Sequence, residues 1–280
     1  MIGPIAHRTG GTKWDRRIER AHALAAAHPA AAEGLRFYER IAGFQRSLYA
    51  DLEAALGSGL EARPPGSLRE ELDLGLLLPA FPGFLALVEA AAPAPLSRST
   101  EELGAGGAAR WQDVLVELWR TGEDAPPRLT AAEALVSWTF LQPYGEYLAD
   151  HSEALEETGS TPDRCPRCSG RPQVGVLRPL GDGGKRSLIC ALCATEWDFR
   201  RIVCPACGEE SVDKLPVYVA EELAHVRVEA CDTCRHYIKT IDLTKDGRAV
   251  PVVDELAAIP LSLWAEEHGY TKLRTNLLGL

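Results

Sequence analysis

CPRCSGRPQVGVLRPLGDGGKRSLICALCATEWDFRRIVCPACG, the stretch from Cys165 to Gly208, contains six of the chain's eight cysteines. The remaining two, Cys231 and Cys234, follow it closely. Every cysteine stands in a Cys-x-x-Cys pair, and the gaps between successive pairs are 21, 10 and 23 residues. This long-short-long spacing indicates an internal repeat of two similar units. The pairs are Cys165/Cys168, Cys190/Cys193, Cys204/Cys207 and Cys231/Cys234.

Four kinds of site use paired cysteines. A disulfide framework is typical of small secreted proteins and leaves the constant two-residue spacing unexplained. A thioredoxin-type dithiol needs one pair beside a βαβ unit, and a ferredoxin-type iron–sulfur cluster needs a more closely spaced run of cysteines. A single ion held by four thiolates from two tight turns, here called knuckles, fits the spacing best. We therefore predict two mononuclear four-cysteine sites.

The matched spacers favour a sequential pairing of the four knuckles, with a cross-braced pairing of first with third and second with fourth as the alternative. Iron and zinc both accept four sulfur ligands, so the ligands alone leave the metal open. A closed site of this kind has no open position for a substrate, which argues against direct metal catalysis. The sequential pairing places Cys165, Cys168, Cys190 and Cys193 at one ion and Cys204, Cys207, Cys231 and Cys234 at the other.

The residues before the cysteines have a helical pattern. Apolar side chains recur at steps of three and four from Phe37 to Leu52 and again from Trp111 to Trp119, which predicts amphipathic helices. Thr130 and Glu133 form a capping-box signature ahead of a further apolar run. We expect this part of the chain to form an α-helical bundle.

After about residue 160 the pattern changes to short segments rich in β-branched residues, and a short helix is expected around Leu261–His268. The predicted fold class is α+β: a helical domain over 1–160, four-cysteine modules over 161–201 and 202–250, and a C-terminal helix and tail over 251–280. Each module is expected to be a small, rubredoxin-like or zinc-ribbon-like set of β-hairpins. The expected strands are Gln173–Leu177, Arg186–Ile189, Leu215–Val219, Val226–Glu229 and Tyr237–Leu243.

The charge of the 280-residue chain narrows its expected partners. A formal net charge of −10 argues against a general nucleic-acid binder, because such proteins neutralise phosphates with Lys and Arg. The first module has eight basic and three acidic residues from Arg164 to Arg201, whereas Ile202–His236 has three basic and seven acidic ones. We expect the two modules to attract each other and pack together. The alternative is that the basic first module forms a docking surface for an acidic partner segment or nucleic acid.

Nothing in the sequence predicts a membrane span or an export signal, because no run of 18 apolar residues and no hydrophobic N-terminal segment occurs. Arg16 and Arg17 form a twin arginine, but a charged, amphipathic stretch follows them, so we interpret them as part of a solvated helix face. The expected location is the cytoplasm.

Two longer stretches give the chain a family resemblance: EWDFRRIVCPACG at Glu196–Gly208, which includes the third knuckle, and LWAEEHGYTKLRTNLLG at Leu263–Gly279. Together with the paired knuckles they closely resemble formate dehydrogenase accessory proteins of the FdhE type. The resemblance implies a maturation factor, not an enzyme, that binds the catalytic subunit of a molybdenum- or tungsten-containing formate dehydrogenase in the cytoplasm. It also implies that the eight cysteines are metal ligands and favours iron over zinc.

Two positions depart from the full rubredoxin pattern, because Ala194 and Arg235 stand where Gly would follow the second knuckle of each module. This departure bears on a redox role and does not affect metal ligation. The alternative functions are a redox or sulfur-handling enzyme acting during maturation and a zinc-ribbon nucleic-acid-binding protein. The sequence leaves homo-oligomer formation open.

Overall fold

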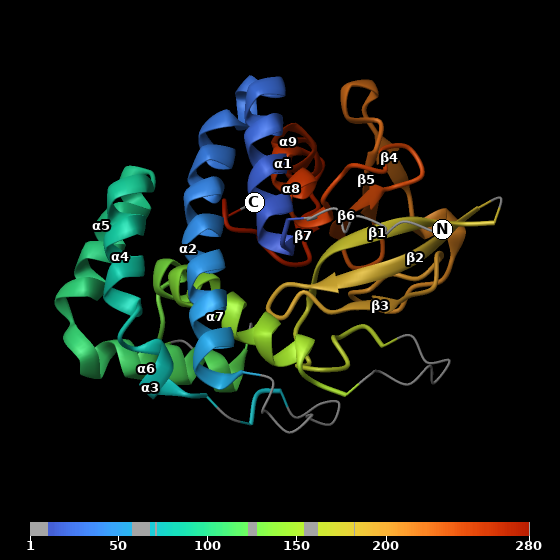
Figure 1. The fold of residues 1–280 in the computed structure, drawn as a ribbon. Coiled ribbons are helices and arrows are strands. Elements are labelled where there is room, and N and C mark those ends of the chain that lie inside the picture. The colour runs from blue at the N-terminus through green and yellow to red at the C-terminus, as the bar shows by residue number, and fades with distance from the viewer. Residues whose placement is uncertain are drawn as a thin grey trace, which may run out of the picture.

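The chain forms a helical N-terminal half that lies beside a C-terminal sheet (Figure 1). The computed structural model describes residues 11–57, 68–70, 72–122, 128–153, 162–181 and 183–279. The predicted α+β class, with helices first and the sheet after them, is confirmed. The expected boundary between residues 160 and 161 lies outside the described residues, so the division into domains stays a prediction.

The N-terminal half consists of helices whose apolar faces meet in one core. Residues 37–52 form part of α2 and residues 111–119 part of α6, and their apolar side chains are mostly buried in that core. The capping box predicted at Thr130 and Glu133 is present at the start of α7, and a second one at Thr12 and Asp15 starts α1. The helices are α1 Lys13–Ala27, α2 Ala32–Leu56, α3 Leu74–Leu77, α4 Phe81–Ala91, α5 Ala94–Ala105, α6 Gly107–Thr121 and α7 Ala131–Asp150.

The expectation of a solvated twin arginine is wrong for one of its two residues. Arg16 is exposed, but Arg17 is buried and donates to both carboxylate oxygens of Glu146 on α7, at 2.7 and 3.2 Å. The Arg17 side chain also lies over the ring of Trp14. A buried carboxylate far away in the sequence therefore determines the position of Arg17, and periodicity alone could not reveal it.

The C-terminal half is built on one seven-stranded sheet with the order β3-β2-β1-β6-β5-β4, and β7 pairs with β6 beyond this path. Four of the five expected strands are found with small shifts at their ends. The fifth, Leu215–Val219, is reduced to the short β4, and β3 and β7 were not expected. The strands are β1 Pro172–Leu180, β2 Gly183–Cys190, β3 Glu196–Asp198, β4 Val217–Val219, β5 Val226–Ala230, β6 His236–Asp242 and β7 Thr271–Lys272.

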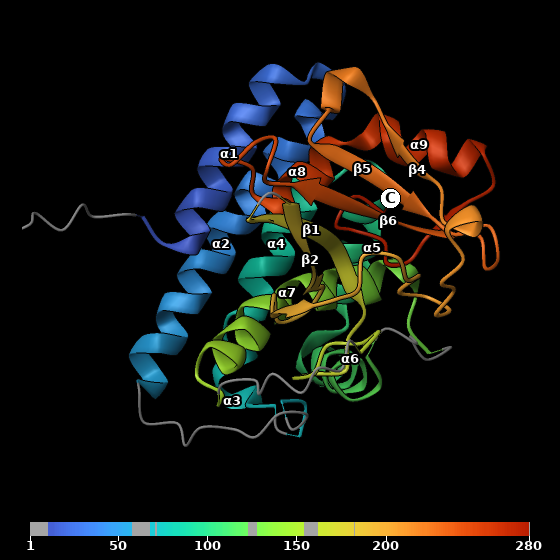
Figure 2. The same cartoon turned by 90° about the vertical axis from the view of Figure 1, so that its right-hand side faces the viewer.

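The two modules share this sheet because β1 and β6 pair in parallel (Figure 2). Each module otherwise pairs antiparallel within itself: β2 pairs with β1 and β3, and β5 pairs with β4 and β6. At the joint Gly175 faces Thr240, and a Cβ at this glycine would collide with the Thr240 hydroxyl oxygen. Close approach of the two strands therefore requires glycine here.

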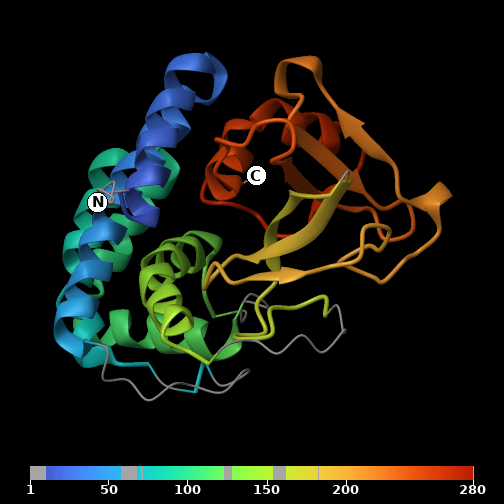
Figure 3. The same cartoon turned by 45° about the vertical axis from the view of Figure 1, so that its right-hand side comes forward.

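The C-terminal segment closes one face of the sheet with α8, Pro251–Ala257, and α9, Ile259–Glu267. In Figure 3 these two red helices lie between the blue α1 and the orange strands, and α8 packs against both α1 and α2. Lys239 on β6 and Lys272 on β7 both pair with the buried carboxylate of Glu255, to which Asn276 also donates. The C-terminal motif thus fixes the tail to the sheet through one buried acid.

Candidate metal centres

The four knuckles share one backbone geometry. In each, the N–H of the first cysteine donates to the carbonyl five residues later, at 2.8 to 2.9 Å, as from Cys165 to Gly170. Three of them also close a turn in which the N–H four residues on donates back to the first cysteine's carbonyl, as Gly208 does to Cys204 at 3.0 Å. The repeat predicted from the sequence is therefore a repeat of local structure.

The residue after the second cysteine has a left-handed backbone in all four knuckles. Only Gly208, with φ of 76°, is a glycine there; Ser169, Ala194 and Arg235 have φ of 56°, 51° and 60°. These three are the non-glycine residues with positive φ in the described part of the chain. A side chain costs energy in this conformation, so the contacts around the knuckles must hold it in place.

The thiols gather in the sequential pairing, as two groups of four whose ligand atoms lie within 4.8 Å of one another. We call Cys165, Cys168, Cys190 and Cys193 site I and Cys204, Cys207, Cys231 and Cys234 site II. All eight are free thiols, and their separations far exceed the roughly 2.05 Å of a disulfide. Three Sγ–Sγ distances in site I are 3.4, 3.5 and 3.6 Å, and two in site II are 3.7 Å each.

These separations suit a tetrahedral ion. Metal–sulfur bonds of about 2.3 Å require sulfur–sulfur edges of about 3.8 Å in a regular tetrahedron. Backbone N–H groups also point at sulfur, from Leu192 to Cys190 Sγ at 3.4 Å and from Ala206 to Cys204 Sγ at 3.3 Å. Such donors offset negative charge on the ligands.

The ionisation of the thiols is linked to the binding of a cation. Burial raises the pKa of Cys190 and of Cys193 well above the ordinary thiol value, and burial raises the pKa of Cys234 to about 11. Hydrogen bonds from Cys168 and its neighbours hold the pKa of Cys165 below its ordinary value. Without a cation each site therefore keeps some of its protons. A bound cation would favour loss of these protons, so binding is expected to release protons.

Gly170 and Arg69 provide a further test of fit at site I. A Cβ at Gly170 would lie 3.2 Å from the sulfurs of Cys168 and Cys190 and 3.4 Å from Nη2 of Arg69. Among the described residues, Nε and Nη2 of this guanidinium are buried without a hydrogen-bond partner. Bound thiolates with a net negative charge would compensate the nearby cation. The residues around site I therefore fit a tetrathiolate ion.

Site I lies inside the junction between the sheet and the helical half. Its four cysteines are buried and belong to the same core as the helices. The carbonyl of Ala191 in the second knuckle accepts from Gln142 at 2.9 Å and from Trp138 at 3.3 Å, both on α7. A Cβ at Gly145 would lie 3.1 Å from Leu192 Cγ. The glycine therefore lets the second knuckle pack closely against α7.

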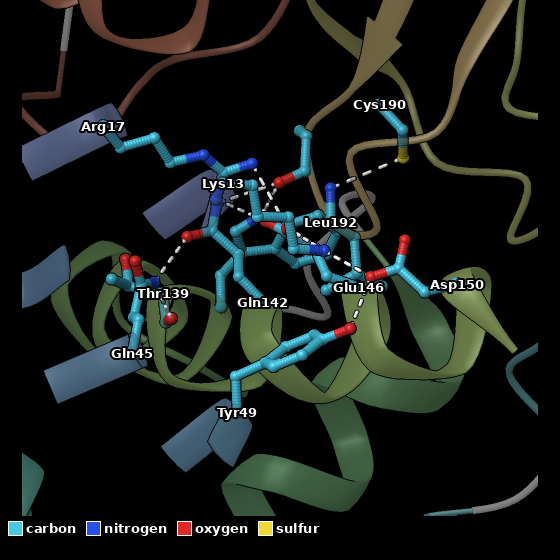
Figure 4. A network of polar contacts seen from close by, with 12 residues as sticks. Lys13, Arg17, Gln45, Tyr49, Thr139, Gln142, Glu146, Asp150, Cys190 and Leu192 are labelled. Atoms are coloured by element: carbon cyan, nitrogen blue, oxygen red, sulfur yellow. Dashed lines mark hydrogen bonds and ion pairs between the residues drawn. The ribbon is translucent and has the colours of Figure 1, made fainter. Parts of the chain in front are cut away.

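Charged contacts join α1 to α7 close to the second knuckle of site I (Figure 4). Lys13 pairs with Glu146 at 2.9 Å and with Asp150 at 2.5 Å, and Arg17 pairs with the same Glu146 carboxylate at 2.7 Å. Figure 4 shows these groups and the contact of Leu192 with Cys190 close together. Site I is therefore enclosed between the helical half and the sheet, a position that suits a structural role.

Site II has a different environment. Cys204 and Cys231 are buried, whereas Cys234 is half-buried and Cys207 is exposed. His236 is half-buried, and its Nδ1 lies 3.0 Å from the Cys234 carbonyl oxygen. Of the two sites, site II is the one that a partner or solvent can reach.

A third group, His225, Asp246 and Asp254, also brings potential ligands together. Here Arg20 donates to both carboxylates and His225 lies 2.9 Å from Asp254. The chain itself thus supplies the positive charge, and this group links α1 to the C-terminal segment.

The basic residues of the first module are largely paired within the molecule. Arg178 pairs with Glu196, Lys185 with Asp198, and Arg200 with Glu210. Arg186 pairs with Glu229 of the second module at 2.6 Å. The opposite charges of the modules therefore meet across the sheet, as expected, and this leaves little free positive surface for phosphates.

No helix in the described ranges combines the length and the apolar character needed to cross a bilayer.

The sequence did not reveal several residues that complete these sites. Gly170 stands two residues after Cys168, one position later than Gly208 stands after Cys207, and this later position brings its backbone against the sulfurs. Arg69 and Gly145 gave no signal, because their roles depend on contacts between the two halves. The buried Glu255 was also missed, although Lys272 and Asn276 in the C-terminal motif are its partners.

Comparison with known proteins shows two adjoining matches to family models. The model described as "FdhE, central domain" matches residues 164–201, and "FdhE, C-terminal domain" matches residues 202–278. A protein FdhE homolog from Aquifex aeolicus is 36% identical over 142 residues, which cover 50% of each chain. That match spans about half the length of the relative, and the same holds for the homolog from Haemophilus influenzae strain PittGG, 34% identical over 152 residues.

Matches from Pseudomonas aeruginosa extend over nearly the whole chain. A protein FdhE homolog from this organism is 29% identical over 297 residues, covering 99% of this chain and 93% of the relative. The crystal structure of the FdhE protein from P. aeruginosa superimposes with a TM-score of 0.65 and 27% sequence identity, covering 96% of both chains. The similarity therefore includes the helical half as well as the sheet.

Proposed function

Because the chain belongs to the FdhE family, we propose that it is an accessory protein for the maturation of a molybdenum- or tungsten-containing formate dehydrogenase. In this proposal it binds the catalytic subunit in the cytoplasm and is needed for assembly or activity. It performs no turnover of its own.

The observation that carries the proposal is the pair of closed four-thiol sites. When bound, an ion with four protein ligands supplies structural cross-linking and, if it is iron, a change of oxidation state. The chain's own groups would hold it: eight thiols, the N–H groups of Leu192 and Ala206, and the nearby guanidinium of Arg69. No ligand position is left for a substrate, which supports a binding role over a catalytic one. The family favours iron, with zinc as the alternative.

One observation favours a second candidate function. The exposed thiol of Cys207 would suit a redox or sulfur-handling enzyme that acts on the dehydrogenase. Such an enzyme would need thiols that react while the protein is folded and loaded with metal. Modification of two or more thiols per folded, metal-loaded chain by a disulfide reagent would support this candidate, and complete protection would exclude it.

The main proposal is tested by affinity capture of the purified catalytic subunit and by activity in cells that lack the accessory protein. We expect wild type to bind and to restore dehydrogenase activity. The double variant Cys231→Ala/Cys234→Ala, which dismantles the more exposed site, should lose both, while Ser169→Ala, an exposed change beside site I, should keep both. Circular dichroism of each variant shows whether the helical half remains folded. Unchanged binding and activity in the double variant would refute the proposed role of the site.

A further inference from the structure

An apolar groove lies directly beside site II, on the face of the sheet opposite α8 and α9. Its volume is about 440 Å³. The floor is formed by side chains of the sheet, among them Leu177 and Ile238, and one wall is formed by the third knuckle with Cys204 and Pro205. Cys231 of the fourth knuckle also lines it. We call this feature the site II groove.

Three aliphatic side chains line the groove and are nevertheless exposed to solvent. Ile202 is 51% exposed, Val212 66% and Val217 53%. They come from the linker between the modules, from the segment after site II's first knuckle, and from the short strand β4. Aliphatic groups that gather around a concavity, unlike single exposed ones, mark a surface for a partner.

The charges of the groove indicate what else the partner carries. Arg186 is already paired with Glu229, and Arg227 with Asp242. The remaining cation is Arg201, which is exposed and has no hydrogen bond or ion pair among the described residues. On a chain of net charge −10, one uncompensated guanidinium at an apolar groove favours a carboxylate over a cation.

We propose that the site II groove receives an apolar segment of the dehydrogenase catalytic subunit that carries a carboxylate beside its apolar side chains. The inference rests on the function proposed above and adds the surface that performs it. The occupant buries Ile202, Val212 and Val217, and its carboxylate pairs with Arg201. Because Cys204 and Cys231 line the groove, the bound segment of the catalytic subunit contacts site II. Site I keeps its structural role.

The proposal predicts which surface changes weaken binding of the purified catalytic subunit. Ile202→Arg and Val217→Arg should each raise the dissociation constant about tenfold, the expected loss for one well-buried aliphatic contact. Arg201→Glu should weaken binding at low salt and lose much of its effect at high salt. Leu180→Arg is the matched control, because Leu180 is 64% exposed but lies outside the groove, and it should bind as wild type does.

A second probe tests the groove without the client. The dye 1-anilinonaphthalene-8-sulfonate combines aromatic rings with an anionic sulfonate. The rings match the aliphatic lining of the groove, and the sulfonate matches Arg201. Its fluorescence should rise with wild type and Leu180→Arg, and the rise should be lost with Ile202→Arg and reduced with Arg201→Glu. Equal metal content and circular dichroism in all variants show that the changes act at the surface.

The outcomes separate this inference from the proposed function. If wild type binds the catalytic subunit and all groove variants bind equally well, the inference is wrong and the function stands. If wild type fails to bind while the dye still distinguishes the variants, the proposed function and client are wrong, and the apolar, anion-accepting groove stands. If light scattering finds a dimer that the groove variants dissociate without affecting client binding, the groove is a self-association surface and the inference is overturned.

Discussion

Replacing Ser169 by glycine should strengthen metal binding at site I. Ser169 is exposed, follows the second cysteine of the first knuckle and has φ of 56°. A side chain in this left-handed conformation costs about 1 to 2 kcal/mol relative to glycine. Glycine also raises the conformational entropy of the unfolded chain, which offsets about 0.4 to 1 kcal/mol of that gain. The net gain is about 0.5 to 1 kcal/mol, or a factor of about two to five in affinity if the empty knuckle is free to leave the conformation.

Site II offers the reverse change. Gly208 has φ of 76°, and a Cβ there would meet nothing within 4 Å, so Gly208→Ala tests the backbone alone. It should lower the affinity of site II by a similar factor. A competition titration against a chromophoric zinc chelator, fitted with one constant for each site, measures both variants. Ser169→Ala is the control, because it removes the hydroxyl and keeps the Cβ. Equal site I constants for Ser169→Gly and Ser169→Ala would refute the reasoning.

Three further changes have separate readouts. Gly170→Ala places a methyl group 3.2 Å from two sulfurs and should weaken site I about tenfold in the same titration while leaving site II unchanged; an unaltered site I would contradict the close approach. Glu255→Gln should cost about 3 to 5 kcal/mol at pH 7 in urea unfolding, because two buried lysines lose their partner. Burial raises the pKa of Glu255, but the two lysines outweigh burial and lower this pKa to about 2. The carboxylate therefore stabilises the fold above about pH 4.5 and loses that effect as the pH falls through 2. The gap between wild type and variant should therefore close in that window, and a constant gap would contradict the assignment. After chelation, Cys207 should react with iodoacetamide before the other seven thiols, as followed by peptide mass spectrometry, and uniform reaction would contradict its unique exposure.

The sequence predicted the elements whose causes are local. Apolar residues at helical spacing set α2 and α6, the capping box set the start of α7, and β-branched segments marked most of the strands. Equal spacers between the knuckles indicated the grouping of thiols that the structure has. These signals are visible because each depends on residues that are neighbours in the chain.

Features that depend on distant partners were not predictable. The single sheet results from parallel pairing of β1 with β6, which needs a glycine at position 175 opposite Thr240. Burial of Arg17 depends on Glu146, 129 residues away. The difference between a buried site I and a partly exposed site II follows from packing against α7, since the Cys-x-x-Cys spacing is identical in both.

The most direct test of the two metal centres is metal analysis of anaerobically purified protein, with absorption spectra before and after oxidation. We predict one tetrathiolate ion in each of the two four-cysteine groups. Cys165→Ala/Cys168→Ala and Cys231→Ala/Cys234→Ala should each remove one of them. Iron would turn the oxidised protein red through ferric thiolate charge transfer, and zinc would leave it colourless. Purified protein that contains no bound metal, or whose metal content is the same in both double variants, would contradict the assignment.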